Sequence, residues 1–561
     1  MIKKYSEQII IALIALILIT LCFSAIFRID LSSDKRYSIS DQTKRLLKSA
    51  EKTIDITVFL DGDLNPGFQR LKTSTRDMLE EMSVYAKKDI EVSFENPSKA
   101  NNETERLKRY AELEAQGMTP TAIYERDKEG KAIQKIVFPW IKISSGEKTV
   151  YVNLLKNIRG NSGEENLNIS IENLEFEITD GIRRVLNNEV TRIAFLEGHG
   201  ELNEAETYSV SKILSRYFQI DRGVLADDAS VLDGYRAVII ANPSQAFSES
   251  DKYIIDQYIM RGGRVLWLLD GVKLAAENLS TTGISPAIEL DLNLSDQLFK
   301  YGVRLAPVLL QDIQSVQVPV NIAPQGAEPQ FEPAPFYYAP LLLASYQHPI
   351  TRNITEVKAA FASALEPVGE NKELKNHLLL ASSDNTHIVT TPATIEMSET
   401  ADPNDKNYFN EAYVPVAMLS EGIFQSNFAN RMTPPNLKNT APLLQKSVAT
   451  RQIFVADGDI IRNETNGVAS DSTTLPAGFD RYMNRQFGNP DFIRNAVLYL
   501  TDEEGWLELR SRTLRLRLLN KNIVTEQRLF WQIINVATPV VLVLIAGLIY
   551  HRRRKRIYGR Q

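Results

Sequence analysis

The sequence predicts an α/β protein that is anchored in a membrane by two apolar spans and carries a large exterior region. Uncharged apolar runs occupy residues 9–27 and 533–550. Between them, short apolar runs alternate with amphipathic helical patterns, as in βαβ units. With 561 residues the chain is too long for one ordinary domain. We expect an N-terminal α/β domain over 30–165, a bridging helix over 166–190 and a larger parallel-sheet domain over 191–505.

The two apolar runs define the expected topology. Each is just long enough to cross a bilayer as a helix at about 1.5 Å per residue. Six of the first ten residues of the tail 551–561 are Arg or Lys, and Lys3 and Lys4 lie in residues 1–8. Positive charge favours the cytoplasmic side, so both termini are predicted to be cytoplasmic. The exterior region, with a membrane-proximal segment over 506–532, then faces the periplasm from a bacterial inner membrane.

A cleaved signal peptide is the alternative interpretation of residues 9–27. The apolar run is longer than the usual apolar part of such a peptide, and no clean small-x-small cleavage site follows it. We therefore expect residues 9–27 to remain as a transmembrane helix.

The N-terminal domain is predicted from its order of elements. "TIDITVFLDGD" and "DIEVSFENP" are typical of strands, and helical patterns follow each of them. Further strands are expected around tight turns at residues 128–130 and 145–147. The order β-α-β-α-β-β is compatible with a thioredoxin-like layout. Redox chemistry is excluded because the single cysteine, Cys22, lies in the first span and no Cys-x-x-Cys exists.

The larger domain is predicted from the strands "RIAFL", "RAVIIA" and "RVLWLL", which alternate with helices. This alternation indicates a parallel sheet with right-handed crossovers, resembling a non-catalytic glutamine-amidotransferase or flavodoxin-like fold. The later runs "HLLLASSDN", "VPVAMLSEG" and "RQIFVADGD" are candidates to join the sheet. The proline-rich stretch over 320–340 is predicted to be a long loop or lid.

Polar residues gather where these strands end. Glu197, His199, Asn242, Asp270 and Asp457 each follow a predicted strand. Ligands of parallel α/β sheets bind outside the carboxyl ends of the strands. We therefore expect these five residues to share one rim, which is a candidate ligand-binding site.

The stretch "LEGHGE" at residues 196–201 has four possible roles. His199 could act as a base, but no serine or cysteine nucleophile stands in a recognisable motif. A metal held by Glu197, His199 and Glu201 would need further ligands from distant strands. A polar ligand pocket and a purely structural glycine turn are the other two. No catalytic residue, metal or cofactor is predicted.

Nucleotide motifs are absent from the sequence. Gly198 and Gly200 begin a dinucleotide fingerprint, but Asn203 stands where the third glycine belongs. No G-x-x-x-x-G-K-[ST] phosphate loop occurs, so we expect no ATP hydrolysis by this chain. The net charge of -6 gives no reason to expect nucleic-acid binding.

Several stretches together resemble one family. They are "FRIDLSSDKRYSIS", "VFLDGDLNPGFQRLKTSTRDMLEEM", "RIAFLEGHGE", "GFDRYMNRQFGNPDFIRNAVLYL", "EGWLELRSRTLRLRLLNK" and the "NVATP" of the last span. In this order, between two spans, they resemble the GldG family of auxiliary, or "substrate-binding", components of gliding-motility-associated ABC transporters in Bacteroidota. The resemblance runs from residue 28 to the tail.

The resemblance implies an ATPase and a membrane permease as partners, and a role in gliding motility and the associated protein secretion. It supplies no catalytic residues. The expected function is thus a non-enzymatic auxiliary subunit whose periplasmic domain contacts the permease or the cargo. The alternative is a membrane-anchored periplasmic hydrolase or amidase that uses the rim around His199.

Overall fold

The computed structural model describes residues 38–558, with gaps. The residues not described within this range are 101, 127–131, 159–160, 188–189, 322, 324–327, 353, 355, 370–372, 397–401, 436, 466–473, 504, 506 and 508–526. The predicted span 9–27 and most of the segment 506–532 lie outside the described residues. The chain separates into a unit of residues Met1–Thr513 and a unit of residues Leu514–Gln561.

The N-terminal part of the first unit follows the predicted alternation of elements. It contains α2 (Asp41–Ser49), β1 (Ile54–Val58), α3 (Pro66–Tyr85), β2 (Ile90–Phe94), α4 (Glu103–Ala115), β3 (Thr121–Arg126), β4 (Ala132–Val137), β5 (Trp140–Ser145) and β6 (Lys148–Asn153). Ser40 caps α2, and Asn65 with Pro66 begins α3, both common helix starts. The turn predicted at residues 145–147 is present, with Gly146 in the left-handed region.

Four of these strands form one sheet in the order β2-β1-β5-β6. The pair β1–β2 is parallel, whereas β5 runs antiparallel to both β1 and β6. The hairpin β3–β4 forms a separate two-stranded sheet.

Two helices stand where the sequence predicts one bridging helix. They are α5 (Gly163–Glu172) and α6 (Leu174–Leu186), and the chain turns between them at Asn173. The predicted apolar face packs on the N-terminal sheet, where Leu174, Ile178 and Ile182 are buried in the core. Residues 163–186 therefore pack on the N-terminal sheet and do not form a free connection.

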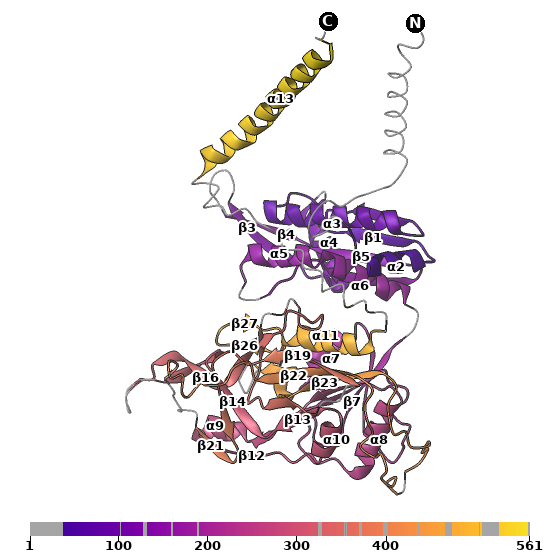
Figure 1. Cartoon of the computed structure of the whole chain (residues 1–561), viewed down its shortest axis with the longest axis vertical. Coiled ribbons are helices and arrows are strands. Elements are labelled where there is room, and N and C mark those ends of the chain that lie inside the picture. The colour runs from indigo at the N-terminus through magenta and orange to yellow at the C-terminus, as the bar shows by residue number, and fades with distance from the viewer. Residues whose placement is uncertain are drawn as a thin grey trace. The chain divides into compact units, whose positions relative to one another are not determined.

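The larger part of the first unit is built on a ten-stranded sheet (Figure 1). Its order is β15 (Ser315–Asn321), β16 (Phe331–Ala344), β19 (Leu374–Ala381), β22 (Pro415–Gly422), β23 (Thr450–Val455), β10 (Val265–Leu268), β9 (Ala237–Ala241), β7 (Arg192–Leu196) and β8 (Gln219–Gly223), with β17 (Glu356–Lys358) paired to β16. The strands from β23 to β8 are mutually parallel. Those from β15 to β23 pair antiparallel.

The prediction of a parallel sheet is therefore wrong for half of the strands. The three later runs do join the sheet, but β19 and β22 do so in antiparallel pairs. The residues of β22 from Val416 to Ser420 are all buried. A strand covered on both faces shows the same continuous apolar run in either direction, so its orientation could not be recognised from the pattern.

Helices cover both faces of the parallel half. α7 (Tyr208–Leu214) and α11 (Asn489–Thr501) lie on one face, and α8 (Glu249–Met260) and α10 (Ser295–Lys300) lie on the other (Figure 1). The chain leaves β7 first towards β8 and later returns to β9 on the opposite side, so the direction of winding reverses between β7 and β9. Such a switch point is the usual ligand position in open α/β sheets. The flavodoxin-like description stays a prediction for this extended, mixed sheet.

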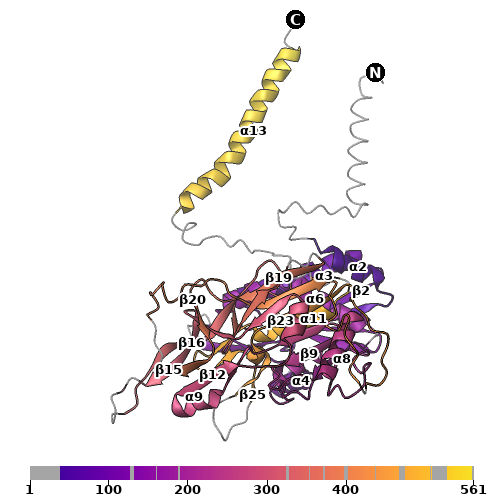
Figure 2. The same cartoon turned by 60° about the horizontal axis from the view of Figure 1, so that its bottom comes forward.

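The stretch over 320–340 is not the predicted loop. Residues Phe331–Ala344 form the long strand β16, which pairs with β15 in a hairpin that extends outward from the sheet (Figure 2). Its prolines are tolerated because the hairpin lies at the sheet's edge, where fewer backbone N–H groups are needed.

The remaining elements are short. They are β11 (Val272–Leu274), α9 (Ala276–Thr282), β12 (Ile284–Glu289), β13 (Val303–Ala306), β14 (Val308–Asp312), β18 (Ala364–Pro367), β20 (Thr386–Thr390), β21 (Ala393–Glu396), the 3-10 helix η2 (Gly458–Ile461), β24 (Glu464–Thr465), β25 (Thr474–Leu475), β26 (Phe479–Asp480) and β27 (Arg485–Gln486).

The second unit contains the helix α13 (Arg528–Tyr558). Within it, Arg528–Arg556 is long and apolar enough to cross a membrane, and it is the one such helix among the described residues. It includes the predicted span 533–550.

Candidate functional site

The loop after β7 is fixed to the loop after β9 by backbone hydrogen bonds. The N–H of Leu202 donates to the carbonyl of Ala241 at 2.9 Å. The N–H groups of Ser244 and Gln245 both donate to the carbonyl of His199, also at 2.9 Å. Gly200 has φ +74°, which other residues rarely adopt, so the glycine allows this turn. The loops after β7 and β9 therefore lie together at the switch point of the sheet, and ligand binding there stays a prediction.

His199 lies in this rim as a buried side chain between two carboxylates. Its side chain is 8% exposed. Nδ1 lies 3.1 Å from Oε1 of Glu201, and Nε2 lies 3.2 Å from Oδ2 of Asp251 at the start of α8. The ring stacks on Phe247 with centroids 3.8 Å apart. Both ring nitrogens and one ring face are thus occupied by neighbouring groups.

This environment favours the charged form of His199. Burial lowers the pKa of the imidazole, but the hydrogen bonds to Asp251 and Glu201 outweigh it and raise the pKa to about 9. For the carboxyl of Asp251 burial acts in the opposite direction and raises the pKa. The hydrogen bonds with His199 and Ser248 outweigh burial, so the pKa of Asp251 lies below its usual value. At neutral pH His199 is an imidazolium that donates from both nitrogens, so it has no lone pair with which to act as a base.

Glu197 points to a different partner. Nε of Arg222 in β8 donates to Oε1 of Glu197 at 2.7 Å, and Nη2 of the same arginine donates to the carbonyl of Leu202 at 2.6 Å. Arg222 also lies over the ring of Phe195, 4.8 Å from its centroid. Glu197 therefore helps Arg222 to tie the end of β7 to the following turn.

The other predicted residues meet at the ends of β9, β10 and β23. The amide of Asn242 donates to Oδ1 of Asp459 at 2.9 Å, and the N–H of Gly458 donates to Oδ1 of Asp270 at 2.6 Å. Asp457 is fully buried and accepts from the N–H groups of Ala360 and Asp459, both at 2.8 Å. This second cluster is held together mainly by backbone donors.

Burial and the neighbouring charges favour the protonated forms of two carboxyl groups in this cluster. Burial and the charge of Asp459 raise the pKa of Asp270 to about 7. Burial and the charges of Asp270 and Asp459 raise the pKa of Asp457 well above its usual range. Among the residues that the structure describes, no group of three or more His, Cys, Asp or Glu side chains is arranged to hold a metal ion.

The rim thus brings the five predicted residues to one sheet edge, but in separate arrangements. Asn242, Asp270 and Asp457 belong to the acidic cluster, His199 lies between Glu201 and Asp251, and Glu197 pairs with Arg222. Asp251 and Phe247 were missed by the sequence reasoning. Ser248 and Asp251 have helix-start spacing, but nothing in the sequence shows that this helix start faces His199.

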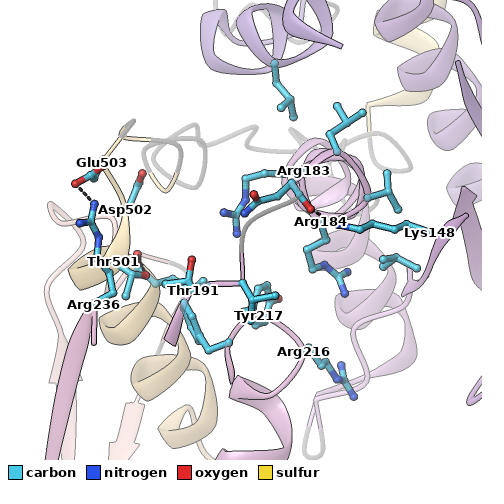
Figure 3. Close-up of a pocket in the computed structure, with 18 of the residues that line it drawn as sticks. Lys148, Arg183, Arg184, Thr191, Arg216, Tyr217, Arg236, Thr501, Asp502 and Glu503 are labelled. Carbon is cyan, nitrogen blue, oxygen red and sulfur yellow. Dashed lines mark hydrogen bonds and ion pairs between the residues drawn. The ribbon is translucent and has the colours of Figure 1, made fainter. Parts of the chain in front are cut away.

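A cavity lies at the opposite, amino-terminal edge of the parallel strands. Its volume is about 1370 Å³. One side is formed by residues at the starts of β7, β8 and β9 and after α11, including Arg192, Tyr217, Arg236 and Glu503. Lys148 and Arg184, which come from the N-terminal part, form the other side (Figure 3). No motif or spacing in the sequence indicates this cavity, because its lining comes from elements far apart in the chain.

Comparison with protein families assigns the class. Residues 191–496 match the model of an ABC-transporter auxiliary family, described as "ABC-type uncharacterized transport system". The match spans more than half of the chain, and the protein belongs to this family. Residues 33–144 match a second model, described as "Domain of unknown function (DUF7088)". The family supports an auxiliary role in transport, and together with α13 it supports association with a membrane.

Individual relatives are distant. A protein of Borreliella burgdorferi named "Uncharacterized protein" is 22% identical over 546 residues, covering 95% of this chain and 94% of that protein. The solved structure "mmIFT52 N-terminal domain" is 14% identical, covers 56% of this chain and 99% of its own, and has a TM-score of 0.31. That TM-score is too low to support a functional conclusion.

Proposed function

We propose that the protein is a membrane-anchored, non-enzymatic auxiliary subunit of an ABC transporter, and that its exterior region contacts the permease or the cargo. The main support is that the chain contains both the region that matches the ABC-transporter auxiliary family and an apolar helix, α13, that is long enough to cross a membrane. The ATPase would come from a partner, because this chain has no phosphate loop.

The proposed topology has two spans in a bacterial inner membrane, with both termini in the cytoplasm and the main region in the periplasm. The basic cluster Arg552–Arg556 at the end of α13 supports a cytoplasmic C-terminus. The apolar run 9–27 supplies the second anchor in this proposal.

The finer assignment is membership in the GldG group, with a role in gliding motility and the associated protein secretion. The order of the motifs from residue 28 to the tail supports it. The name of the Borreliella relative describes no role and neither supports nor opposes the assignment.

The hydrolase or amidase alternative has less physical support. Its base would be His199, but both imidazole nitrogens contact carboxylates and the raised pKa keeps the ring protonated. A general base must be neutral at the working pH. We propose instead that "LEGHGE" is a structural turn that closes the rim.

Asn535 offers a specific contact to test. Its amide lies on α13 among aliphatic residues, where exposure to lipid would be unfavourable. We expect it to face a helix of the permease. The tagged full-length protein should therefore recover the permease and the ATPase from detergent-solubilised membranes, and Asn535→Leu should recover less of both.

Val543→Leu is the matched control, because it changes an exposed aliphatic residue of the same helix. Equal recovery by the wild type and Asn535→Leu would exclude the contact at Asn535. Failure of the wild type to recover either partner would overturn the auxiliary function. Release of amines from peptidoglycan by the wild type, lost in His199→Ala, would favour the amidase.

A further inference from the structure

The cavity at the amino-terminal edge of the sheet has an excess of positive charge on the α6 side. Nη2 of Arg183 lies 3.6 Å from Oδ1 of Asp180, and Nε of Arg184 lies 3.1 Å from Oδ2 of the same carboxylate. The side chain of Asp180 is 1% exposed. Both arginines line the cavity from α6.

Two further cations line the cavity, Lys148 at the start of β6 and Arg216 between α7 and β8. Nζ of Lys148 donates to the carbonyl of Asn187 at 2.5 Å, which leaves its charge uncompensated. Arg216 is exposed and, like Lys148, forms no ion pair within the part of the chain that the structure describes. Figure 3 shows Lys148, Arg184 and Arg216 extending from separate elements.

The acidic residues that line the cavity compensate only part of this charge. Glu503 pairs with Arg236, and Asp233 pairs with Arg261, which does not line the cavity. Both oxygens of Asp502 accept N–H groups of its own loop. Glu51 and Glu147 also line the cavity and are exposed, as Lys148 and Arg216 are. Seven Lys or Arg residues and five Asp or Glu residues line the cavity in all, so positive charge is in excess. Within the described residues, an anionic ligand would therefore meet cations without an ion-pair partner at Lys148 and Arg216.

The size of the cavity limits the kind of anion. At about 1370 Å³ it exceeds the roughly 300–1,000 Å³ of ordinary small-molecule sites. Tyr217, Phe218 and Leu498 add apolar surface to the lining. Cations from separate elements suit carboxylates spaced along a chain better than one compact phosphate, which is usually held by converging donors.

We propose that this cavity binds an acidic peptide segment through Lys148, Arg184 and Arg216. This inference rests on the proposed function for the source of the peptide, which would belong to the permease or to a transported protein. The carboxylates of the segment would pair with the three cations, and its apolar groups would lie against Tyr217 and Phe218.

The test is direct binding to the full-length protein in detergent. The probe is a fluorescein-labelled peptide of alternating Glu and Ala, followed by fluorescence anisotropy. The variant is Lys148→Gln/Arg216→Gln, which removes two cations without leaving a buried carboxylate unpaired. We expect its affinity to fall about tenfold, or roughly 1.4 kcal/mol. Added salt should weaken binding to the wild type.

Lys273→Gln/Lys300→Gln is the matched control, since both lysines are exposed and lie outside the cavity. This control changes the net charge by the same amount as Lys148→Gln/Arg216→Gln, and its affinity for the acidic peptide should fall by less than about twofold. No binding by the wild type, an equal loss in the control, or equal binding of a Lys-Ala peptide would overturn the proposal. Competition by inorganic polyphosphate at lower concentration than the peptide would overturn the peptide class.

The permease pull-down separates this inference from the function on which it rests. If the wild type recovers the permease and ATPase but does not bind the acidic peptide, only the cavity proposal fails. If it recovers neither partner but binds the peptide through Lys148 and Arg216, the auxiliary function fails and the binding site stands.

Discussion

The charged state of His199 gives a prediction that can be worked from the structure. The change is His199→Gln, which keeps a polar side chain of similar length but cannot carry the charge. A rise of the pKa from 6.5 to about 9 corresponds to roughly 3 kcal/mol at 1.36 kcal/mol per pKa unit. The side chain of Asp251 is 22% exposed, so water screens part of the attraction. We expect the variant to be about 2–3 kcal/mol less stable at pH 6.

The sign of the pH dependence follows from the raised pKa of His199. The folded state holds the proton more tightly than the unfolded state, so the stabilisation is fully present below pH 6.5. It is lost as the pH rises from 6.5 through about 9. The difference between wild type and His199→Gln should therefore shrink across this window.

Two measurements check this prediction. Histidine-labelled NMR gives the pKa directly, and with five histidines in the chain the variant identifies the His199 resonance. His348 provides an internal contrast, because burial and the charges of His377 and Arg451 lower its pKa to about 4. Denaturant unfolding, followed by the buried Trp267, gives the stability at pH 6 and pH 9.5. A His199 resonance that titrates below pH 7, or a wild-type pH dependence retained in the variant, would refute the reasoning.

Three further predictions test the turn, the missing nucleotide site and the topology. Gly200→Val should destabilise the domain by about 1–3 kcal/mol, because valine rarely adopts φ +74°. Gly223→Val should cost less stability, because the space at its Cβ position is open, and comparable losses of the two variants in denaturant unfolding would contradict this. Calorimetry of the full-length protein with Mg-ATP should show no binding, and micromolar affinity would disprove the expectation. A reporter active only outside the cytoplasm should be inactive when fused to Gln561; activity there would reject the two-span topology.

Local signals made much of the fold predictable. Ser248 caps α8 and Gly262 ends it with φ +97°, and both could be read from the residue types. The strands β7, β9 and β10 are almost wholly buried, so each appears as a short apolar run. Strand and helix alternation then placed Asn242 and Asp270 at one edge, because parallel strands end together.

Long-range pairing was not predictable from these signals. The direction of β22 depends on its neighbours β19 and β23, which are distant in sequence. The partner of His199 is another case, since Asp251 lies 52 residues away and reaches the ring only after α8 packs against the sheet. The cavity likewise combines Lys148 and Arg216 from separate elements, and no spacing along the chain relates them.

The two edges of the parallel sheet differ in how many polar side chains remain available to bind a ligand. At the carboxyl edge His199 is held by two carboxylates, Glu197 by Arg222, and Asp457 by two backbone N–H groups. A ligand there would have to break hydrogen bonds that the protein already makes, so it would gain little net free energy. At the amino edge Lys148 and Arg216 have no carboxylate partner among the described residues, so an anion would add ion pairs without displacing existing ones. We therefore expect the carboxyl edge to serve mainly as structure, and the proposed recognition of an acidic segment to take place at the amino edge.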